Sequence, residues 1–231
     1  MYIEGGFRIY GPVDIKPLQQ QVLTMSQEIW DEDKWRQKAL GAQRESESIM
    51  LCWSGLCCKT WYQNKPEKNL RDFYSINQWN HKNYNLIKET LDPLLEQIHT
   101  YRPGGILRAI LIRLDPSKQV YPHIDEDITF NFASRVHVPI LSDGKTEFNS
   151  GGESFYPEEG VMFEIDNVRT HSVKNKGSSR RIHLVMDIYG DWPISDGIPP
   201  ECPKCGGALE IQNSKSGIVL GCNTNSIPIN K

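Results

Sequence analysis

The sequence lacks any apolar run long enough to cross a membrane. A transmembrane helix needs roughly 20 consecutive apolar residues, and no stretch of the 231 residues approaches that composition. The N-terminal segment MYIEGGFRIYGPVDIK carries charges and glycines where a signal peptide requires an apolar core. We therefore expect a soluble, cytoplasmic protein that has no membrane partner.

The sequence also lacks a basic block of the kind that binds nucleic acid. Lys and Arg together number 26 and Asp and Glu 29, so the formal net charge is −3, and no basic cluster stands out. Proteins that bind nucleic acid depend on clustered cations that neutralise phosphates. The composition therefore gives no indication of a nucleic-acid partner.

Cysteines are few, and they fall into two clusters. A disulfide framework usually consists of regularly spaced cysteines in a chain that carries a secretory signal, and neither feature is present here. We therefore expect free or metal-bound thiols. The clusters are Cys52, Cys57 and Cys58, and Cys202, Cys205 and Cys222.

The chain is long enough for one large domain, or for one domain with a small appendage. Residues 1–105 are interpreted as a helical and mixed N-terminal support region. The spacing of apolar residues predicts helix over residues 14–29 and a stronger helix over 85–99, which Pro93 is expected to kink or split. Residues 48–56 form a predicted buried strand.

Residues 106–190 consist of short β-prone runs separated by turn residues. This pattern predicts a mainly β sandwich or barrel, and a jelly roll closes such strands around an interior pocket. Residues 191–201 are rich in Pro, Gly and Asp and are interpreted as a linker to a tail at residues 202–231. The predicted strands cover residues 107–114, 120–124, 135–141, 153–155, 161–165, 171–174 and 181–189.

His123 and Asp125 are candidate metal ligands. They are two residues apart in a strand-like run, so their side chains point to the same side of it. His171, which follows a predicted strand and a turn, is the candidate for a third ligand. Two histidines and one carboxylate on one face of an octahedron leave open positions, as in non-haem Fe(II) oxygenases.

Arg181 lies ten residues after His171 and begins the run RIHLVMD. A fixed guanidinium at this position could bind a dicarboxylate through two hydrogen bonds. Arg-x-His occurs here, at Arg181 and His183, and also on an earlier strand, at Arg135 and His137. One Arg-x-His pair on a strand is readily explained as part of an ordinary polar face. Two such pairs next to a set of candidate metal ligands favour a functional role instead.

These motifs resemble the aspartyl/asparaginyl β-hydroxylases and the related proline cis-4-hydroxylases. The resemblance covers residues 106–190, through the segments ILIRLDPSKQVYPHID, SRVHVPI, EEGVMFEIDNVRTHSV and SSRRIHLVMDIYG. It includes Pro-His-x-Asp, Arg-x-His, a later His, and an Arg ten residues after that His. The carboxylate Asp125 is present here, as in the proline hydroxylase branch, whereas the animal aspartyl hydroxylases lack it.

The resemblance implies a double-stranded β-helix, which is a cupin-like jelly roll, and the use of Fe(II), 2-oxoglutarate and O₂. It implies that His123, Asp125 and His171 bind iron and that Arg181 pairs with the distal carboxylate of 2-oxoglutarate. Arg135 and His137 would lie near the carboxylate next to the iron, and His183 would line the pocket. The expected reaction is hydroxylation of an aspartyl, asparaginyl or prolyl residue in a peptide, or of a free amino acid such as proline.

The tail resembles a zinc ribbon. Cys202 and Cys205 form a CxxC knuckle, and Cys222 follows seventeen residues later. A tetrahedral zinc site needs four ligands, and the tail offers three. Either the site is degenerate, or the fourth ligand comes from elsewhere in this chain or from another chain.

Two other functions are compatible with these motifs. The protein could be a jelly-roll interaction module that binds metal without turnover, or a cupin-type metalloenzyme that does not use 2-oxoglutarate. The intact ligand set together with Arg181 argues against the first function. The dependence of 2-oxoglutarate binding on Arg181 distinguishes the hydroxylase from the second. The oligomeric state has no signal in the sequence.

Overall fold

The computed structural model describes residues 3–32, 34–54, 77–79, 81–125, 133–189, 209–214 and 217–222. The helices all precede the strand-rich segment. They are η1 (Glu4–Gly6), α1 (Lys16–Leu23), α2 (Gln27–Asp31), α3 (Trp35–Ala39), η2 (Gly41–Gln43) and α6 (His81–Tyr101). The strands are β1 (Phe7–Pro12), β2 (Glu47–Ser54), β3 (Asn77–Trp79), β4 (Gly105–Leu114), β5 (Gln119–His123), β6 (Ala133–Leu141), β7 (Thr146–Ser150), β8 (Glu153–Phe155), β9 (Val161–Ile165), β10 (His171–Asn175), β11 (Arg181–Tyr189), β12 (Leu209–Ser214) and β13 (Gly217–Cys222).

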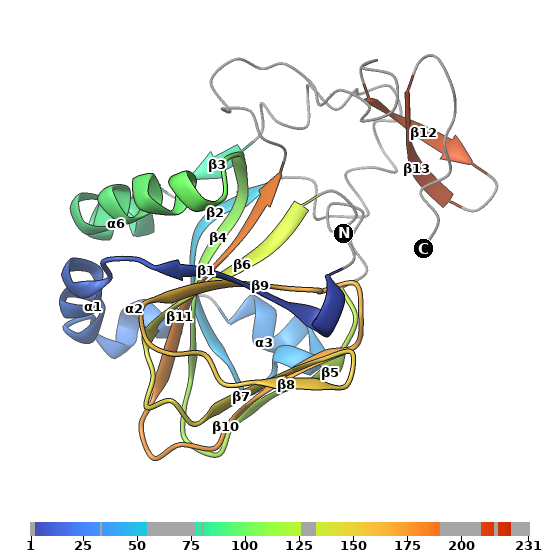
Figure 1. Ribbon diagram of the computed structural model, residues 1–231. Coiled ribbons are helices and arrows are strands. Elements are labelled where there is room, and N and C mark those ends of the chain that lie inside the picture. Colours follow the sequence, from blue (N-terminus) through green and yellow to red (C-terminus); the bar gives the residue numbers. More distant parts are fainter. Residues whose placement is uncertain are drawn as a thin grey trace.

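The strands form two sheets that face each other. The larger sheet has the order β1-β9-β6-β11-β4-β2-β3, and the smaller has the order β5-β10-β7-β8. Figure 1 shows the smaller sheet below the lower half of the larger one, with α6 and α1 on the outer side of the larger sheet. A separate pair, β12 and β13, forms a hairpin near the end of the chain. The described chain is thus mainly β and antiparallel, with two facing sheets as in a jelly roll.

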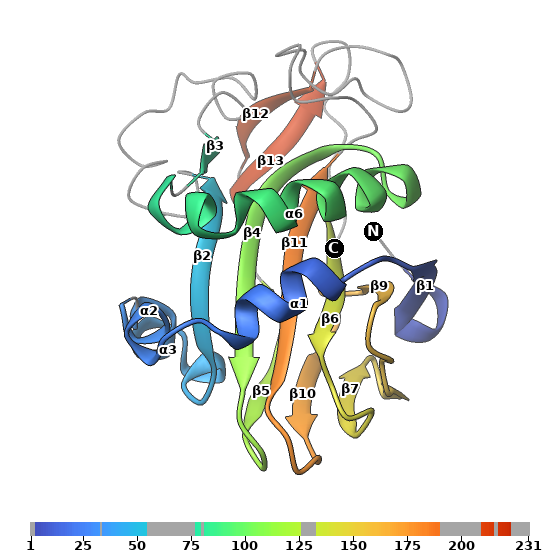
Figure 2. The ribbon, with the colours of Figure 1, turned by 90° about the vertical axis from the view of Figure 1, so that its left-hand side faces the viewer.

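The larger sheet is buried on both faces because helices cover its outer face. Figure 2 shows α6 and α1 crossing strands β2, β4, β11 and β6 on that side. Leu18 and Val22 of α1 and Ile87, Leu91 and Leu94 of α6 are all buried there. These positions recur at helical spacing, so each helix presents one apolar stripe to the sheet.

The central strand β11 divides its side chains between two environments. Ile182, Leu184, Met186 and Ile188 belong to the apolar cluster beneath the helices. Side chains alternate across a strand, so the residues between them face the smaller sheet. Those residues are Arg181, His183, Val185 and Asp187, all of which are buried. The two-residue period of one strand therefore builds the core on one face and a polar interior on the other.

Most predicted strands are confirmed within one or two residues, and three of them, β8, β9 and β11, have the predicted bounds. Five described strands were not predicted, namely β1, β3, β7, β12 and β13, and of these β7 overlaps residues assigned to a turn. The N-terminal region therefore supplies strands to the larger sheet as well as helices.

The helix predictions need two corrections. The helix predicted over residues 14–29 is two helices, since α1 ends at Leu23 and α2 begins at Gln27. Of the two outcomes predicted for Pro93, a split is wrong, because α6 runs continuously from His81 to Tyr101 with Pro93 inside it, and a kink stays a prediction. In the described residues, no helix combines the length and the apolar character needed to cross a membrane.

Leu184 gives a direct test of this packing. Its side chain is fully buried at the centre of the larger sheet, so Leu184→Ala should lower the free energy of unfolding by about 2–5 kcal/mol. Urea denaturation measures this change. Leu23→Ala is the matched control, because Leu23 is 58% exposed and its loss should cost about 0.5 kcal/mol or less. Equal effects of the two substitutions would contradict the assigned packing.

Candidate active site

The pairing of β5 with β10 brings two histidines together. His123 ends β5, His171 begins β10, and the two residues are direct partners across the ladder. Their ring centroids are 4.3 Å apart. Asp125 follows β5. Its Oδ1 atom lies 3.6 Å from His123 Nε2, and its Oδ2 atom lies 3.7 Å from His171 Nε2. One ligand atom from each residue therefore lies within 4.8 Å of the other two.

Both histidines are oriented with the same nitrogen toward the shared centre. His123 Nδ1 donates to the backbone carbonyl of Tyr121 at 2.8 Å, and His171 Nδ1 donates to that of Arg169 at 3.0 Å. Because a carbonyl can only accept, these bonds place the proton on Nδ1 and leave the Nε2 lone pair free for a metal. Burial lowers the pKa of His171 to about 4. The two imidazoles and the carboxylate form a donor set that fits Fe(II).

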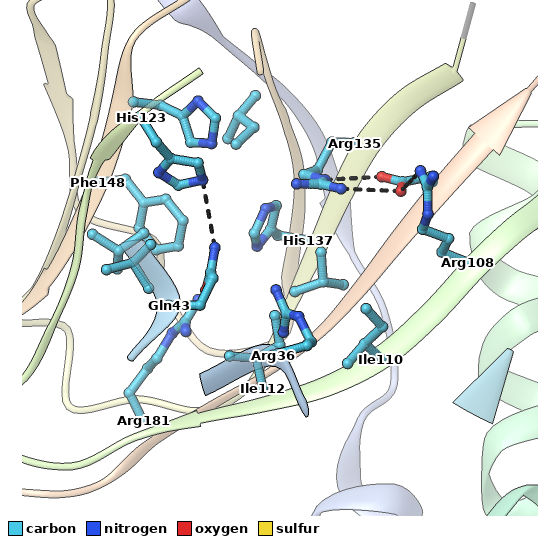
Figure 3. Close-up of a pocket in the computed structure, with 16 residues that line it drawn as sticks. Arg36, Gln43, Arg108, Ile110, Ile112, His123, Arg135, His137, Phe148 and Arg181 are labelled. Carbon is cyan, nitrogen blue, oxygen red and sulfur yellow. Dashed lines mark hydrogen bonds and ion pairs between the residues drawn. The ribbon is translucent and has the colours of Figure 1, made fainter. Parts of the chain in front are cut away.

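Arg135 connects the ligand Asp125 to the larger sheet. Its Nη1 donates to Asp125 Oδ2 at 2.5 Å, while its Nε and Nη2 form a bidentate pair with Asp187 at 2.9 and 3.0 Å. Arg108 donates to the same Asp187 carboxylate at 2.9 Å (Figure 3). Asn167 Nδ2 donates to Asp125 Oδ2 at 3.2 Å. The Asp125 carboxylate is therefore fixed in direction by groups from two other segments.

Asp187 stays ionised despite its burial. Burial alone would raise the pKa of this carboxyl, but the guanidinium groups of Arg135 and Arg108 outweigh that effect and lower it. In the same way, Asp125 and Asp187 raise the pKa of Arg135 against the opposing effect of burial. The alternating charges compensate one another, as buried charges must.

Arg181 lies in the same cavity but has no such compensation. It is buried, its Nε has no hydrogen-bond partner among the described residues, and burial lowers its pKa to about 9. Its guanidinium carbon lies 5.2 Å from the centroid of the Phe148 ring. The group remains protonated at neutral pH, so it is a buried cation that can accept an anionic partner.

His137 lines the cavity beside Arg181, and His183 is buried behind it, against His137 and Phe148. Both side chains are buried, and neither ring nitrogen of either residue has a hydrogen-bond partner in the described part of the chain. Burial, together with the positive charge of Arg181, holds the pKa of each well below the usual value. His183 stacks on Phe148, with ring centroids 5.4 Å apart. These neutral rings make the interior beside Arg181 aromatic.

The cavity between the sheets collects nearly all of the predicted site. It is lined by His123, Arg135, His137, His171 and Arg181, all predicted from the sequence. Asp125 lies at its edge, against His123 and His171. His183 contacts His137 rather than lining the cavity itself.

Four further polar residues in the cavity were not predicted. Arg108 and Asp187 could have been identified, because they occupy the inward positions of strands whose alternate residues are apolar. Arg36 and Gln43 belong to α3 and η2, and nothing in the sequence marks these short helices as part of the site. Gln43 Nε2 lies 3.4 Å from His123 Nε2 (Figure 3).

The predicted zinc site lies outside the described residues. Cys202 and Cys205 are not described, and only the backbone of Cys222 is described, where it pairs with Leu209 in the terminal hairpin. The zinc site therefore stays a prediction.

A comparison with protein families decides the classification. The model of the family described as aspartyl/asparaginyl beta-hydroxylase matches residues 16–190, about three quarters of the chain. The chain belongs to this family. It is therefore a hydroxylase of the 2-oxoglutarate-dependent dioxygenase class, and its His-Asp-His cluster fits the iron that such enzymes use. A search of curated proteins gives no match.

Solved structures that match the chain include several oxygenases. A prolyl hydroxylase from Trichoplax adhaerens, in complex with a hypoxia inducible factor peptide fragment, is 11% identical, with 80% of this chain and 84% of that chain covered and a TM-score of 0.45. A viral collagen prolyl hydroxylase from Paramecium Bursaria Chlorella virus-1, in complex with 2OG, is 12% identical, with coverages of 80% and 95% and a TM-score of 0.41. A 2OG-Fe(II) oxygenase family protein from Burkholderia pseudomallei is 13% identical, with coverages of 62% and 67% and a TM-score of 0.42. Likenesses this weak support no functional assignment.

His183 supplies a test of the site's electrostatics. An unfolded His binds a proton near pH 6.5, whereas buried His183 stays neutral at that pH. The pKa of His183 is lower in the folded state than in the unfolded state, so its contribution to stability is fully present above about pH 6.5. As the pH falls below that value, the free energy of unfolding decreases by up to about 1.4 kcal/mol per pH unit. His183→Asn should therefore make the unfolding free energy of the metal-free protein depend less steeply on pH between about 6.5 and 5.

Urea denaturation at a series of pH values measures that slope. Phe163→Leu is the control, because it alters the neighbouring core without removing a titratable group. It should lower stability at every pH and leave the slope as it is in the unmodified protein. A slope that His183→Asn leaves unchanged would contradict the assigned burial.

Proposed function

We propose that this protein hydroxylates a C–H bond of an amino acid, either free or within a peptide. In this reaction one oxygen atom of O₂ enters the substrate and the other enters succinate, as 2-oxoglutarate loses CO₂. The observation that carries the proposal is a single cavity that holds both a His-Asp-His donor set and an unpartnered buried arginine.

His123, Asp125 and His171 would hold the iron. Bound there, iron supplies open coordination positions for 2-oxoglutarate and O₂ and the oxidising chemistry that cleaves a C–H bond. The protein's own contribution is to fix the ligands. Arg135 and Asn167 hold the carboxylate, and two backbone carbonyls set the tautomer of the histidines.

Arg181 would bind the distal carboxylate of 2-oxoglutarate. A guanidinium can bind a carboxylate through two parallel hydrogen bonds, which fixes orientation as well as position. His137 would lie along the bound molecule toward the iron, and His183 and Phe148 would keep water away from it. Arg135 is already held by two carboxylates, so any contact with the co-substrate would be additional to those.

The jelly-roll assignment also supports the proposal. A jelly roll is built from two sheets, and here β5 and β10 of the smaller sheet supply both histidines to the cavity between the sheets. The predicted zinc-ribbon tail is proposed only as an appendage, with Cys202, Cys205 and Cys222 as its ligands.

Removal of one ligand tests the metal site. His123→Ala should weaken Fe(II) binding by about tenfold or more, since even residues that only orient a ligand cost about 10–100-fold. Anaerobic equilibrium dialysis with iron analysis measures this binding. His99→Ala is the control, because His99 is exposed on α6 and lies outside the cavity. Iron binding that His123→Ala leaves unchanged would place the metal elsewhere.

Replacement of Arg181 tests the co-substrate. Arg181→Ala should weaken 2-oxoglutarate binding by about 10- to 150-fold, because a hydrogen bond to a charged group contributes about 1.5–3 kcal/mol. Calorimetry on the Mn(II)-loaded protein measures the affinity. The neighbouring Arg180→Ala is the matched control, because Arg180 forms only a surface pair with Asp115. Equal affinity in the two variants would favour a metalloenzyme that does not use 2-oxoglutarate.

Turnover tests the reaction itself. Purified protein supplied with Fe(II), ascorbate, 2-oxoglutarate and O₂ should form succinate, and mass spectrometry should find one added oxygen atom on a free amino acid or a short peptide. If no panel member is modified and no succinate forms while iron and 2-oxoglutarate bind, the protein is a binding module and the proposal is wrong.

A further inference from the structure

Arg36 is a buried cation that the proposed chemistry does not use. It lies on α3, its residue is 6% exposed, and its Nε and Nη1 have no hydrogen-bond partner among the described residues. Burial lowers its pKa to about 10, so it remains charged at neutral pH. A buried, unpaired charge is costly and therefore calls for an explanation.

The neighbouring carboxylates are already occupied. Asp125 and Asp187 attract Arg36, while Arg135 and Arg108 repel it. Asp125 forms its close ion pair with Arg135 instead, and Asp187 forms ion pairs with Arg135 and Arg108. The protein therefore provides no full compensation for the charge on Arg36.

The charges of the cavity are unbalanced even when the expected ligands are counted. Four arginines line it, whereas the adjoining carboxylates, Asp125 and Asp187, are shared between two of those arginines. Iron adds two positive charges, and 2-oxoglutarate brings two negative ones to the iron and Arg181. The four guanidinium groups and the iron together exceed the two carboxylates and the dianion by two positive charges, and the guanidinium of Arg36 is the one for which neither the protein nor 2-oxoglutarate supplies an ion-pair partner.

Arg36 is on the wall of the cavity that reaches the metal ligands. Figure 3 shows Arg36 and Gln43 pointing into the cavity, together with Ile110 and Ile112 of β4. Ser46 Oγ donates to the backbone oxygen of Gln43 at 2.8 Å and to its Oε1 at 3.3 Å, which leaves Nε2 directed at His123. A molecule bound against this wall would therefore be next to the reacting centre.

We propose that Arg36 binds a carboxylate of the substrate and so restricts the enzyme to carboxylate-bearing substrates. This inference rests on the proposed function. The carboxylate has two possible sources, the α-carboxylate of a free amino acid and the side chain of an aspartyl residue in a peptide. Internal prolyl and asparaginyl residues have no carboxylate, so they are excluded. Arg36 is thus a determinant of specificity that comes from the N-terminal helices.

The test compares carboxylates with their neutral carboxamides. The protein is loaded with Mn(II) and 2-oxoglutarate, which bind without turnover, and is titrated calorimetrically with free L-amino acids, their carboxamides, and paired aspartyl and asparaginyl peptides. We expect binding of at least one carboxylate and about tenfold weaker binding of its carboxamide. Binding of the free amino acids identifies the first source, and binding of the aspartyl peptides identifies the second.

Variants of Arg36 separate recognition from structure. Arg36→Gln should weaken binding of the selected carboxylate about tenfold or more, and Arg36→Lys should restore part of it. Lys38→Gln, an exposed change of equal charge on the same helix, should have no effect. Arg36→Met removes an uncompensated buried charge, so it should raise the thermal midpoint of the substrate-free protein.

Several results would overturn the proposal. In the binding experiment, equal affinity for carboxylate and carboxamide, or no binding of any carboxylate, would overturn it. In the stability experiment, strong destabilisation by both Arg36→Met and Arg36→Gln would show that the role of Arg36 is structural. The iron and 2-oxoglutarate affinities of the unmodified protein are measured first. If they are absent, the proposed function fails; if they are present and Arg36→Gln has no effect, only this inference fails.

Discussion

The ion pairs of Arg135 hold the two sheets of this protein in one functional arrangement. Arg135 lies on β6 of the larger sheet, binds Asp187 on β11 of the same sheet, and reaches across to Asp125 after β5 of the smaller sheet. All of these groups are largely buried, so each charge depends on its partner. The position of the carboxylate beside the two histidines is therefore fixed through Arg135 by the larger sheet, on which Arg135 and Asp187 lie.

The electrostatics of the cavity follow from the same arrangement. Charges that the protein compensates are structural, as in the group formed by Arg108, Arg135, Asp125 and Asp187. Charges that it leaves uncompensated are Arg181 and Arg36, both buried and lacking partners for part of the guanidinium. A folded protein retains such groups at a cost to stability, and the cost is offset when an anion binds. The two arginines thus mark two anion positions, one on β11 and one on α3.

Much of the fold could be predicted because apolar periodicity is a local property. The bounds of β9 and β11 follow from runs of apolar residues between turn residues. β7 was missed because its buried positions include Thr146 and Ser150, which have the composition of a turn. The break between α1 and α2 was missed because apolar spacing continues across residues 24–26.

The candidate site was predictable where its residues are close in sequence or fall in the ordered motif. His123, Asp125, His171 and Arg181 belong to that motif and meet in space as expected. Asp187 could have been predicted as a site residue, since it is a polar residue at an inward position of an otherwise apolar strand. Arg36 and Gln43 could not have been predicted as site residues, because only the packing of two short helices against the cavity brings them to the metal ligands.

The central claim is that one cavity holds both a metal on His123, Asp125 and His171 and a dicarboxylate on Arg181. A crystal structure of the protein with Mn(II) and 2-oxoglutarate tests it most directly. The account predicts metal bound by the two Nε2 atoms and the Asp125 carboxylate, with the distal carboxylate of 2-oxoglutarate paired with Arg181 and Arg36 still facing the remaining space. Metal at another site, or 2-oxoglutarate paired with Arg36 instead of Arg181, would contradict it.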